Sequence, residues 1–212
     1  MTGPRLVLAT RNRHKLGELR AILLEQGIAG QAQVRGVVGL DDATGPAGQP
    51  VPEVAETGVT FAQNALLKAR AAHTATGLAA LADDSGLSVD VLGGAPGVFS
   101  ARWCGRHGDD EANLRLLLDQ LADVPDEHRR ARFVCALALV TADGREQVHH
   151  GEMAGTLTRE PAGGHGFGYD PVFRPDGCDV TSAQLTPAQK NRISHRAAAV
   201  LAAGAAVGRL LG

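Results

Sequence analysis

Two adjacent carboxylates, Asp83 and Asp84, interrupt a nearly uncharged, apolar part of the chain. Residues 78–82 predict a short buried strand, and the apolar alternation over residues 87–91 predicts a second strand with one covered face. A Ser-Gly pair follows the carboxylates, so we expect the backbone to kink between the two strands. Two carboxylates held in an apolar frame repel each other and favour a proton, a cation, or both. The pair is therefore the first candidate for acid–base or metal chemistry, although the sequence Asp-Asp-Ser-Gly alone would also suit a solvated turn.

A polar, basic segment near the N-terminus is the second candidate. It lies between a predicted strand at residues 6–9 and a predicted helix marked by the apolar stripe over residues 16–23. A basic turn before a helix presents free backbone N–H groups and the positive end of the helix dipole, which suits a phosphate. A capped turn with solvated basic side chains is the alternative, and the P-loop pattern is absent. The segment comprises Thr10, Arg11, Asn12, Arg13, His14 and Lys15.

A third polar group is expected on a helix over residues 60–77, which begins with a capping box, Thr60-Phe-Ala-Gln63. Asn64 and Lys68 are four residues apart and so lie on one face of this helix. An acidic, Pro- and Gly-rich loop over residues 41–58 precedes it and carries Glu53 and Glu56 near its end. Loops of this length are usually functional or mobile, but both glutamates could equally be surface acids.

The second half of the chain supplies aromatic and basic groups. The Gly-rich stretch 163–170 holds Phe167 and Tyr169, which could stack on a planar base, whereas a tight turn with the phenylalanine packed inward is the competing interpretation. A second capping box, Thr186-Pro-Ala-Gln189, predicts a helix start. The basic residues that follow disfavour a helix start electrostatically, which indicates that they serve a ligand. They are Lys190, Arg192, His195 and Arg196, and an Ala-rich helix continues from there to the C-terminus.

Apolar patterns predict the remaining strands and helices. We expect strands over residues 34–40 and 146–158, a central strand that is apolar on both faces over residues 131–141, and a helix over residues 109–121. A chain of 212 residues fits one domain or one domain with two lobes. The net charge of -2 argues against duplex nucleic acid as the principal partner.

Cysteine usage and hydropathy indicate the compartment. The three cysteines form no CxxC pair, which argues against a disulfide framework and a structural zinc site. The N-terminal apolar run is too short for a signal peptide, and no segment reaches membrane length. We expect a cytoplasmic protein with no membrane partner.

Six motifs in this order carry a resemblance to a known family: LATRNRHK, ETGVTFAQNALLKA, ADDSGL, GGAPGVFSARW, REPAGGHGFGYDPVF and LTPAQKNRISHR. Together they resemble the inosine/xanthosine triphosphate pyrophosphatase family, also called the Ham1 or non-canonical purine nucleotide pyrophosphatase family. The resemblance implies hydrolysis of ITP, dITP and XTP to the monophosphate and pyrophosphate, with Mg²⁺, by a homodimer. It also implies one domain over residues 1–212, an α/β fold of two lobes around a long twisted mixed sheet with flanking helices, and an active site in the cleft between the lobes.

The resemblance also implies a role for each matching residue. Asp84 would be the proton acceptor and a metal ligand, and Glu56 is the candidate second metal carboxylate, with Glu53 close enough to compete. Lys68 would join Lys15 and Lys190 in offsetting phosphate charge. The implied nucleotide contacts are the turn from Thr10 to Lys15, then Ser85, then Phe167, Gly168, Tyr169 and Asp170 around the base, and Lys190, His195 and Arg196 in nucleotide recognition.

Two departures from the family pattern and three rival functions remain. Gln63 stands where many relatives carry Glu, which puts a metal role at that position in doubt, and Arg11 replaces the more usual Gly, which changes the turn or adds a phosphate contact. The nearest rival function is a Maf-like pyrophosphatase for other modified or pyrimidine triphosphates. A non-catalytic nucleotide sensor would need neither Asp84 nor the acidic loop, and a nucleic-acid-binding protein is disfavoured by the charge balance.

Overall fold

A computed structural model describes residues 5–11, 13–45 and 48–212 of the protein, and the side chain of His14 is not described either. One mixed sheet of six strands has the order β2-β1-β3-β4-β5-β6. β1 pairs in parallel with β2 and β3, whereas β5 and β6 pair antiparallel. The strands are β1 (Leu6–Leu8), β2 (Val37–Gly39), β3 (Ala79–Val89), β4 (Arg130–Val140), β5 (Glu146–Leu157) and β6 (Phe173–Pro175).

The helices complete the predicted α/β class and fall into two compact units. The helices are α1 (Arg13–Glu25), α2 (Gln31–Val34), α3 (Phe61–Thr76), α4 (Asp110–Gln120), α5 (Pro187–Ile193) and α6 (His195–Leu211). The first unit comprises residues 1–84, 135–151 and 196–212, and the second comprises residues 85–134 and 152–195. The long strands β3, β4 and β5 contribute residues to both units.

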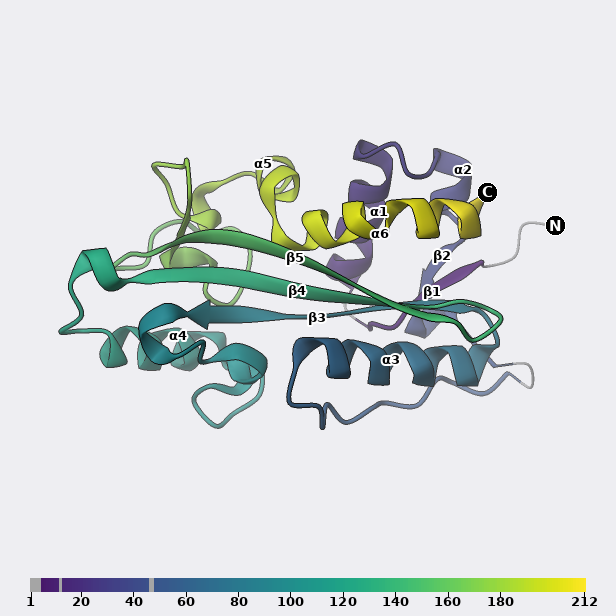
Figure 1. Ribbon diagram of the computed structural model, residues 1–212, viewed down its shortest axis with the longest axis horizontal. Helices are drawn as coiled ribbons and strands as arrows, with labels where there is room; N and C mark the ends of the chain where they lie inside the picture. The colour runs from purple at the N-terminus through teal and green to yellow at the C-terminus, as the bar shows by residue number, and fades with distance from the viewer. Residues whose placement is uncertain (1–4, 12, 46–47) are drawn as a thin grey trace. The chain divides into compact units, whose positions relative to one another are not determined.

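In the first unit, helices cover both faces of the sheet. α1 and α6 lie on one face and α3 lies on the other (Figure 1). The larger core cluster joins leucines of β1 and α1 to Cys135 and Leu137 of β4 and to the small residues of α6. A second cluster packs Ala65 and Ala69 of α3 against Ala136 and Ala138 of β4. Alanine on both sides lets α3 approach the sheet closely, which brings the polar residues of its first turns near β3.

The boundaries of α3 follow from its sequence. Thr60 caps the helix by accepting a hydrogen bond from the Gln63 amide at 3.2 Å. Gly77 ends it in the left-handed conformation at φ 71°, which glycine adopts without strain. The predicted helix over residues 60–77 is therefore confirmed.

The second unit has its own core and two helices. Phe133 of β4 packs against Phe173 of β6 with ring centroids 4.7 Å apart, and leucines of α4 join this cluster. Arg129 is buried beside it and donates to the carbonyl oxygens of Leu121, Leu157 and Thr158. This guanidinium ties the end of α4 to the end of β5, because backbone carbonyls satisfy its donors in place of water.

Two predictions about the strands are wrong. The backbone does not kink at Asp83 and Asp84, because β3 runs unbroken from Ala79 to Val89. The Asp-Asp-Ser-Gly sequence suits a turn locally, but cationic partners from other elements hold both carboxylates in an extended strand. The strand expected over residues 34–40 is shorter, since Val34 belongs to the short helix α2 and β2 begins at Val37.

The sequence predicted neither a disulfide framework nor a segment of membrane length. Cys104, Cys135 and Cys178 are free thiols, so no disulfide links them. Among the described residues, no helix combines the length and the apolar character needed to cross a membrane.

Candidate active site

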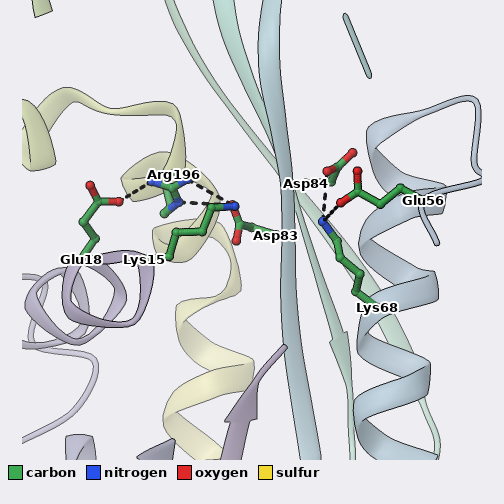
Figure 2. Close-up of polar contacts among 7 residues, drawn as sticks. All are labelled: Lys15, Glu18, Glu56, Lys68, Asp83, Asp84 and Arg196. Atoms are coloured by element: carbon green, nitrogen blue, oxygen red, sulfur yellow. Dashed lines mark hydrogen bonds and ion pairs between the residues drawn. The ribbon is translucent and has the colours of Figure 1, made fainter. Parts of the chain in front are cut away.

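Alternation along β3 sends its two adjacent carboxylates to opposite faces of the sheet. Successive side chains of a strand point to opposite sides. Figure 2 shows Asp83 turned toward α1 and α6, and Asp84 turned toward α3. Both residues are buried, with side chains 5% and 12% exposed respectively. The two carboxylates therefore make different sets of hydrogen bonds, one on each face of β3.

The first cluster centres on Asp83. Its Oδ2 atom accepts from the ammonium of Lys15 at 3.1 Å and from Nη2 of Arg196 at 3.2 Å. Arg196, itself buried, also donates to Glu18 of α1. Burial alone would raise the pKa of Asp83, but the positive charges of Lys15 and Arg196 outweigh burial and hold that pKa well below its usual value. Asp83 is therefore ionised at neutral pH and anchors two cations.

The second cluster centres on Asp84. Its Oδ1 atom accepts from the ammonium of Lys68 at 3.0 Å, and its Oδ2 atom accepts from the Asn64 amide at 3.2 Å. The same ammonium donates to Oε1 of Glu56 at 2.9 Å. Burial and the nearby negative charge of Glu56 raise the pKa of Asp84, although Lys68 and Asn64 oppose the shift. Two neighbouring carboxyls thus have pKa values moved in opposite directions, which is typical of acid–base sites.

Lys68 remains charged in this cluster. Burial would lower the pKa of its ammonium, but the negative charges of Asp84, Asp83 and Glu56 raise it above its ordinary value. The predicted common face of Asn64 and Lys68 is confirmed, since both side chains reach Asp84.

The loop that carries Glu56 is fixed to the first turn of α3. The Gly58 amide donates to Oδ1 of Asn64 at 2.7 Å, and the Val59 amide donates to Oε1 of Gln63 at 2.8 Å. A Cβ atom at Gly58 would lie 2.6 Å from that Asn64 oxygen, so only glycine fits this close approach. Asn64 is fully buried and bridges the loop to Asp84. Glu56, rather than the exposed Glu53, is consequently placed beside Lys68.

The N-terminal turn is partly described. Thr10 and Lys15 belong to it, and the Lys15 ammonium reaches Asp83, whereas Asn12 lies outside the described residues. Arg13 is an exposed residue at the start of α1. Arg11 donates to Asp41 at 2.9 Å and to the carbonyl of Val51 at 2.7 Å. In this structure Arg11 therefore ties the turn to the acidic loop.

The Gly-rich loop of the second unit positions a half-exposed aromatic ring. Phe167 is 52% exposed, and the ammonium of Lys190 lies 5.4 Å from its ring centroid, within the range of a cation–π contact. The buried carboxylate of Asp170 accepts from that ammonium and from the Phe167 amide. The inward-packed alternative for this phenylalanine is wrong, because Asp170 holds the loop so that the ring stays accessible for stacking.

Other contacts brace the same loop. Tyr169 is buried and donates to the Ser100 carbonyl at 2.9 Å, and the Gly168 amide donates to Asp110 of α4 at 2.9 Å. Burial is the main cause that raises the pKa of Tyr169 above its usual value. His195 is also buried and stacks on Phe133 at 5.1 Å between ring centroids. Ser85 is half-buried on β3.

The residues around Asp84 supply some, but not all, of the ligands that a hard divalent cation needs. Among the described residues, no group of three or more His, Cys, Asp or Glu side chains could hold a metal. Two carboxylates do converge on one positive charge, the Lys68 ammonium. Mg²⁺ commonly uses one or two protein carboxylates and takes its other ligands from water and phosphates. Glu56 and Asp84 therefore fit a metal that arrives with a phosphorylated ligand.

Sequence reasoning missed two residues that complete these clusters. Glu18 binds Arg196, and Asp110 holds the backbone of the Gly-rich loop. Glu18 follows Lys15 by three residues on one helix, so helical spacing could have indicated that the two side chains share a face. Asp110 gave no such signal, because its contact joins segments 58 residues apart.

Comparison with known proteins defines the class to which this fold and these clusters belong. The Ham1 family model matches residues 6–205, and the chain belongs to the Ham1 family. A relative from Streptomyces coelicolor named dITP/XTP pyrophosphatase is 57% identical over 98% of this chain and 99% of its own length. A relative of the same name from Mycobacterium tuberculosis is 57% identical over 92% of this chain and 91% of its own.

Solved structures give the same family. A nucleoside-triphosphatase, described as a dITP/XTP pyrophosphatase, from Mycobacterium abscessus is 49% identical with a TM-score of 0.71 and covers 97% of both chains. The Ham1 protein of Staphylococcus aureus is 36% identical with a TM-score of 0.80 and covers 96% of this chain and 97% of its own. The expected family and the mixed α/β fold are thereby confirmed.

Proposed function

We propose that this protein is a nucleoside-triphosphate pyrophosphohydrolase that converts dITP, XTP and ITP to the monophosphate and pyrophosphate, and so removes them from the nucleotide pool. The relatives named dITP/XTP pyrophosphatase support this proposal through their 57% identity over nearly the whole chain. The observation that carries it is the Asp84 cluster: a buried carboxylate with a raised pKa, held between an amide and an ammonium beside a second carboxylate.

Asp84 is the proposed proton acceptor. A carboxyl whose pKa is raised takes a proton more readily near neutral pH than an ordinary aspartate does. Asn64 fixes its Oδ2 atom, so the carboxylate keeps a defined orientation toward the attacking water. The proton of that water passes to Asp84 as the water oxygen attacks the α-phosphorus, and pyrophosphate leaves.

Cationic side chains are proposed to offset the charge of the substrate. Lys15 and Lys68 come from the first unit, and each is held in place by a buried aspartate. Lys190 of the second unit is held by Asp170. Preorganised ammonium groups stabilise the charge that develops on phosphate oxygens without a reorganisation cost. The residues from Thr10 to Lys15, together with Ser85, are proposed as further contacts to the phosphates and the nucleotide.

Mg²⁺ is the proposed metal, with Asp84 and Glu56 as its protein ligands. When bound, it would neutralise phosphate charge and polarise the scissile bond. The convergence of these two carboxylates on one ammonium supports the assignment, because it marks a point where the protein favours positive charge.

Base selection is proposed to involve Phe167, Gly168, Tyr169 and Asp170 of the Gly-rich loop, with Lys190, His195 and Arg196. The half-exposed Phe167 ring offers a stacking surface. A donor aimed at the 6-oxo group of hypoxanthine or xanthine would face the amino group of adenine, and a site built around such a hydrogen bond can discriminate by roughly 10⁴-fold. ATP should therefore be a poor substrate.

A substrate panel tests the proposal. Purified protein is incubated with dITP, XTP, dGTP, ATP and pyrimidine triphosphates, with Mg²⁺ or with a chelator, and released pyrophosphate and orthophosphate are quantified separately. We expect pyrophosphate from dITP and XTP only, and none in chelator. ATP hydrolysis as efficient as dITP hydrolysis, a preference for pyrimidine triphosphates, or nucleotide binding without turnover would each refute the proposal.

We propose that the protein is a homodimer located in the cytoplasm. Each chain is proposed to form one domain over residues 1–212. The family resemblance supports the dimer. Light scattering coupled to size-exclusion chromatography measures the assembly directly, and a monomer at micromolar concentration would contradict it.

A further inference from the structure

The Lys68 ammonium lies between the two carboxylates that are proposed to hold the metal. Its Nζ atom is 2.9 Å from Oε1 of Glu56 and 3.0 Å from Oδ1 of Asp84 (Figure 2). Its side chain is only 16% exposed, so these two acids stand in for most of the water that a free ammonium would bind. The ammonium is thus already in direct contact with both carboxylates.

We infer that Lys68 is an internal counter-ion that takes the place of the divalent metal in the nucleotide-free protein, so that the metal and Lys68 compete for Glu56 and Asp84. This inference rests on the proposed function for the identity of the metal ligands. Carboxylate oxygens that point at an ammonium must be shared with, or surrendered to, an arriving Mg²⁺ ion. The free protein should consequently bind divalent metal weakly.

Release of Lys68 requires another anion to receive it. A poorly hydrated ammonium without a counter-ion is costly, so the metal alone gains little by displacing it. A triphosphate supplies that anion, because its oxygens can accept from Lys68 while the metal takes the carboxylates. Metal and nucleotide should therefore enter together, which keeps the free enzyme without a tightly held metal.

The opposite face of β3 provides an internal comparison. There Asp83 and Glu18 meet Lys15 and Arg196, so two negative charges balance two positive ones. On the Asp84 face, two carboxylates meet one ammonium, which leaves one net negative charge among the residues in Figure 2. Among these residues, the Asp84 face therefore carries the surplus negative charge that attracts a further cation, and removal of its ammonium should strengthen that attraction.

Direct metal binding without nucleotide tests the inference. Mn²⁺ is titrated into the full-length protein at pH 8, and free Mn²⁺ is followed by its paramagnetic resonance signal. Lys68→Met keeps an unbranched side chain, one atom shorter, and the helix propensity while removing the charge. We expect the Mn²⁺ dissociation constant to fall by about tenfold or more, in line with loss of a competing charge in direct contact with both ligands. Lys15→Met is the matched control, which removes the same charge from the other face and should change the constant by less than Lys68→Met does, because the Lys15 ammonium contacts Asp83, whereas the Lys68 ammonium contacts both Glu56 and Asp84.

Unchanged or weaker Mn²⁺ binding in Lys68→Met, or an equal gain in Lys15→Met, would overturn the inference. Lys68→Gln is the second neutral variant if Lys68→Met folds poorly, and Mn²⁺ should raise the melting temperature of either variant more than that of the wild type. Adding Glu56→Gln should abolish the gain. No nucleotide is present, so failure of the substrate panel would refute the proposed function alone, whereas failure here would leave turnover untouched.

Discussion

Asparagine in place of Asp83 is expected to destabilise the protein strongly. The substitution preserves side-chain size but removes the charge to which Lys15 and Arg196 both donate at 3.1 and 3.2 Å. Arg196 keeps Glu18, yet both cations lose a carboxylate that is only 5% exposed. Removing one partner of a buried ion pair costs about 3–5 kcal/mol. For a chain of this size that loss corresponds to a melting temperature lowered by about 6–20 °C.

Asparagine in place of Asp84, one residue along the strand, is expected to change stability little and to reduce activity strongly. Because the folded protein raises the pKa of Asp84, it favours the neutral carboxyl relative to the unfolded chain, so a neutral amide costs little. Lys68 keeps its 2.9 Å contact with Glu56. The free energy of unfolding should change by about 1 kcal/mol or less, whereas dITP hydrolysis should fall by about 10²–10⁴-fold through loss of the proton acceptor.

Two measurements on the two variants test whether Asp83 stabilises the fold and Asp84 serves catalysis. Urea unfolding followed by circular dichroism gives the stability, and pyrophosphate release from dITP gives the activity. The reasoning is refuted if Asp83→Asn unfolds at the wild-type urea concentration, or if Asp84→Asn loses as much stability as Asp83→Asn. Near-normal turnover by Asp84→Asn would remove its proposed role as proton acceptor.

Three further predictions concern stability and titration. Since Asp83 has a lowered pKa in the folded protein, its ionised form stabilises the fold above the ordinary pKa of 3.8, and this contribution is lost as pH falls. In urea unfolding, the difference in unfolding free energy between wild type and Asp83→Asn should therefore shrink progressively below pH 3.8. Tyr169 is the single tyrosine and has a raised pKa, so the tyrosinate absorbance of the folded protein should appear only above pH 10.0, and a normal titration would contradict its burial. Gly58→Ala should destabilise the protein by about 1–3 kcal/mol through the 2.6 Å approach to Asn64, whereas the control Gly17→Ala, which meets nothing within 4 Å on a helix, should stabilise it by roughly 0.5–1 kcal/mol.

The boundaries of α3 and the start of α5 were predictable from the sequence because caps are local. Thr60 and Gly77 delimit α3 through contacts within a few residues, and the box at Thr186 sets the start of α5 in the same way. Hydrophobic periodicity predicted individual strands and helices for a similar reason, and the resemblance to the family supplied the mixed α/β class. The family was predictable as well, since six motifs in fixed order carry far more information than any one element.

The course of β3 was not predictable from local signals. Asp-Asp-Ser-Gly is a sequence typical of turns, and only partners distant in sequence make it extended. The contacts that hold Asp83 span 68 residues to Lys15 and 113 residues to Arg196. A single sequence gives no measure of such distant pairs, so a local preference was overridden by tertiary ion pairing.

The chemistry of the candidate site depends on that extended strand. A kink would have let Asp83 and Asp84 share one environment, in which mutual repulsion raises one pKa or demands a metal for both. A continuous strand points them to opposite faces of the sheet, so each carboxyl accepts hydrogen bonds from its own cations. Asp83 then fixes Lys15 and Arg196, and Asp84 meets Lys68 instead. Because the period of a strand is two residues, a single adjacent pair can supply both an inert anchor and a reactive group, and inserting one residue before Asp83 would exchange the faces and abolish both roles.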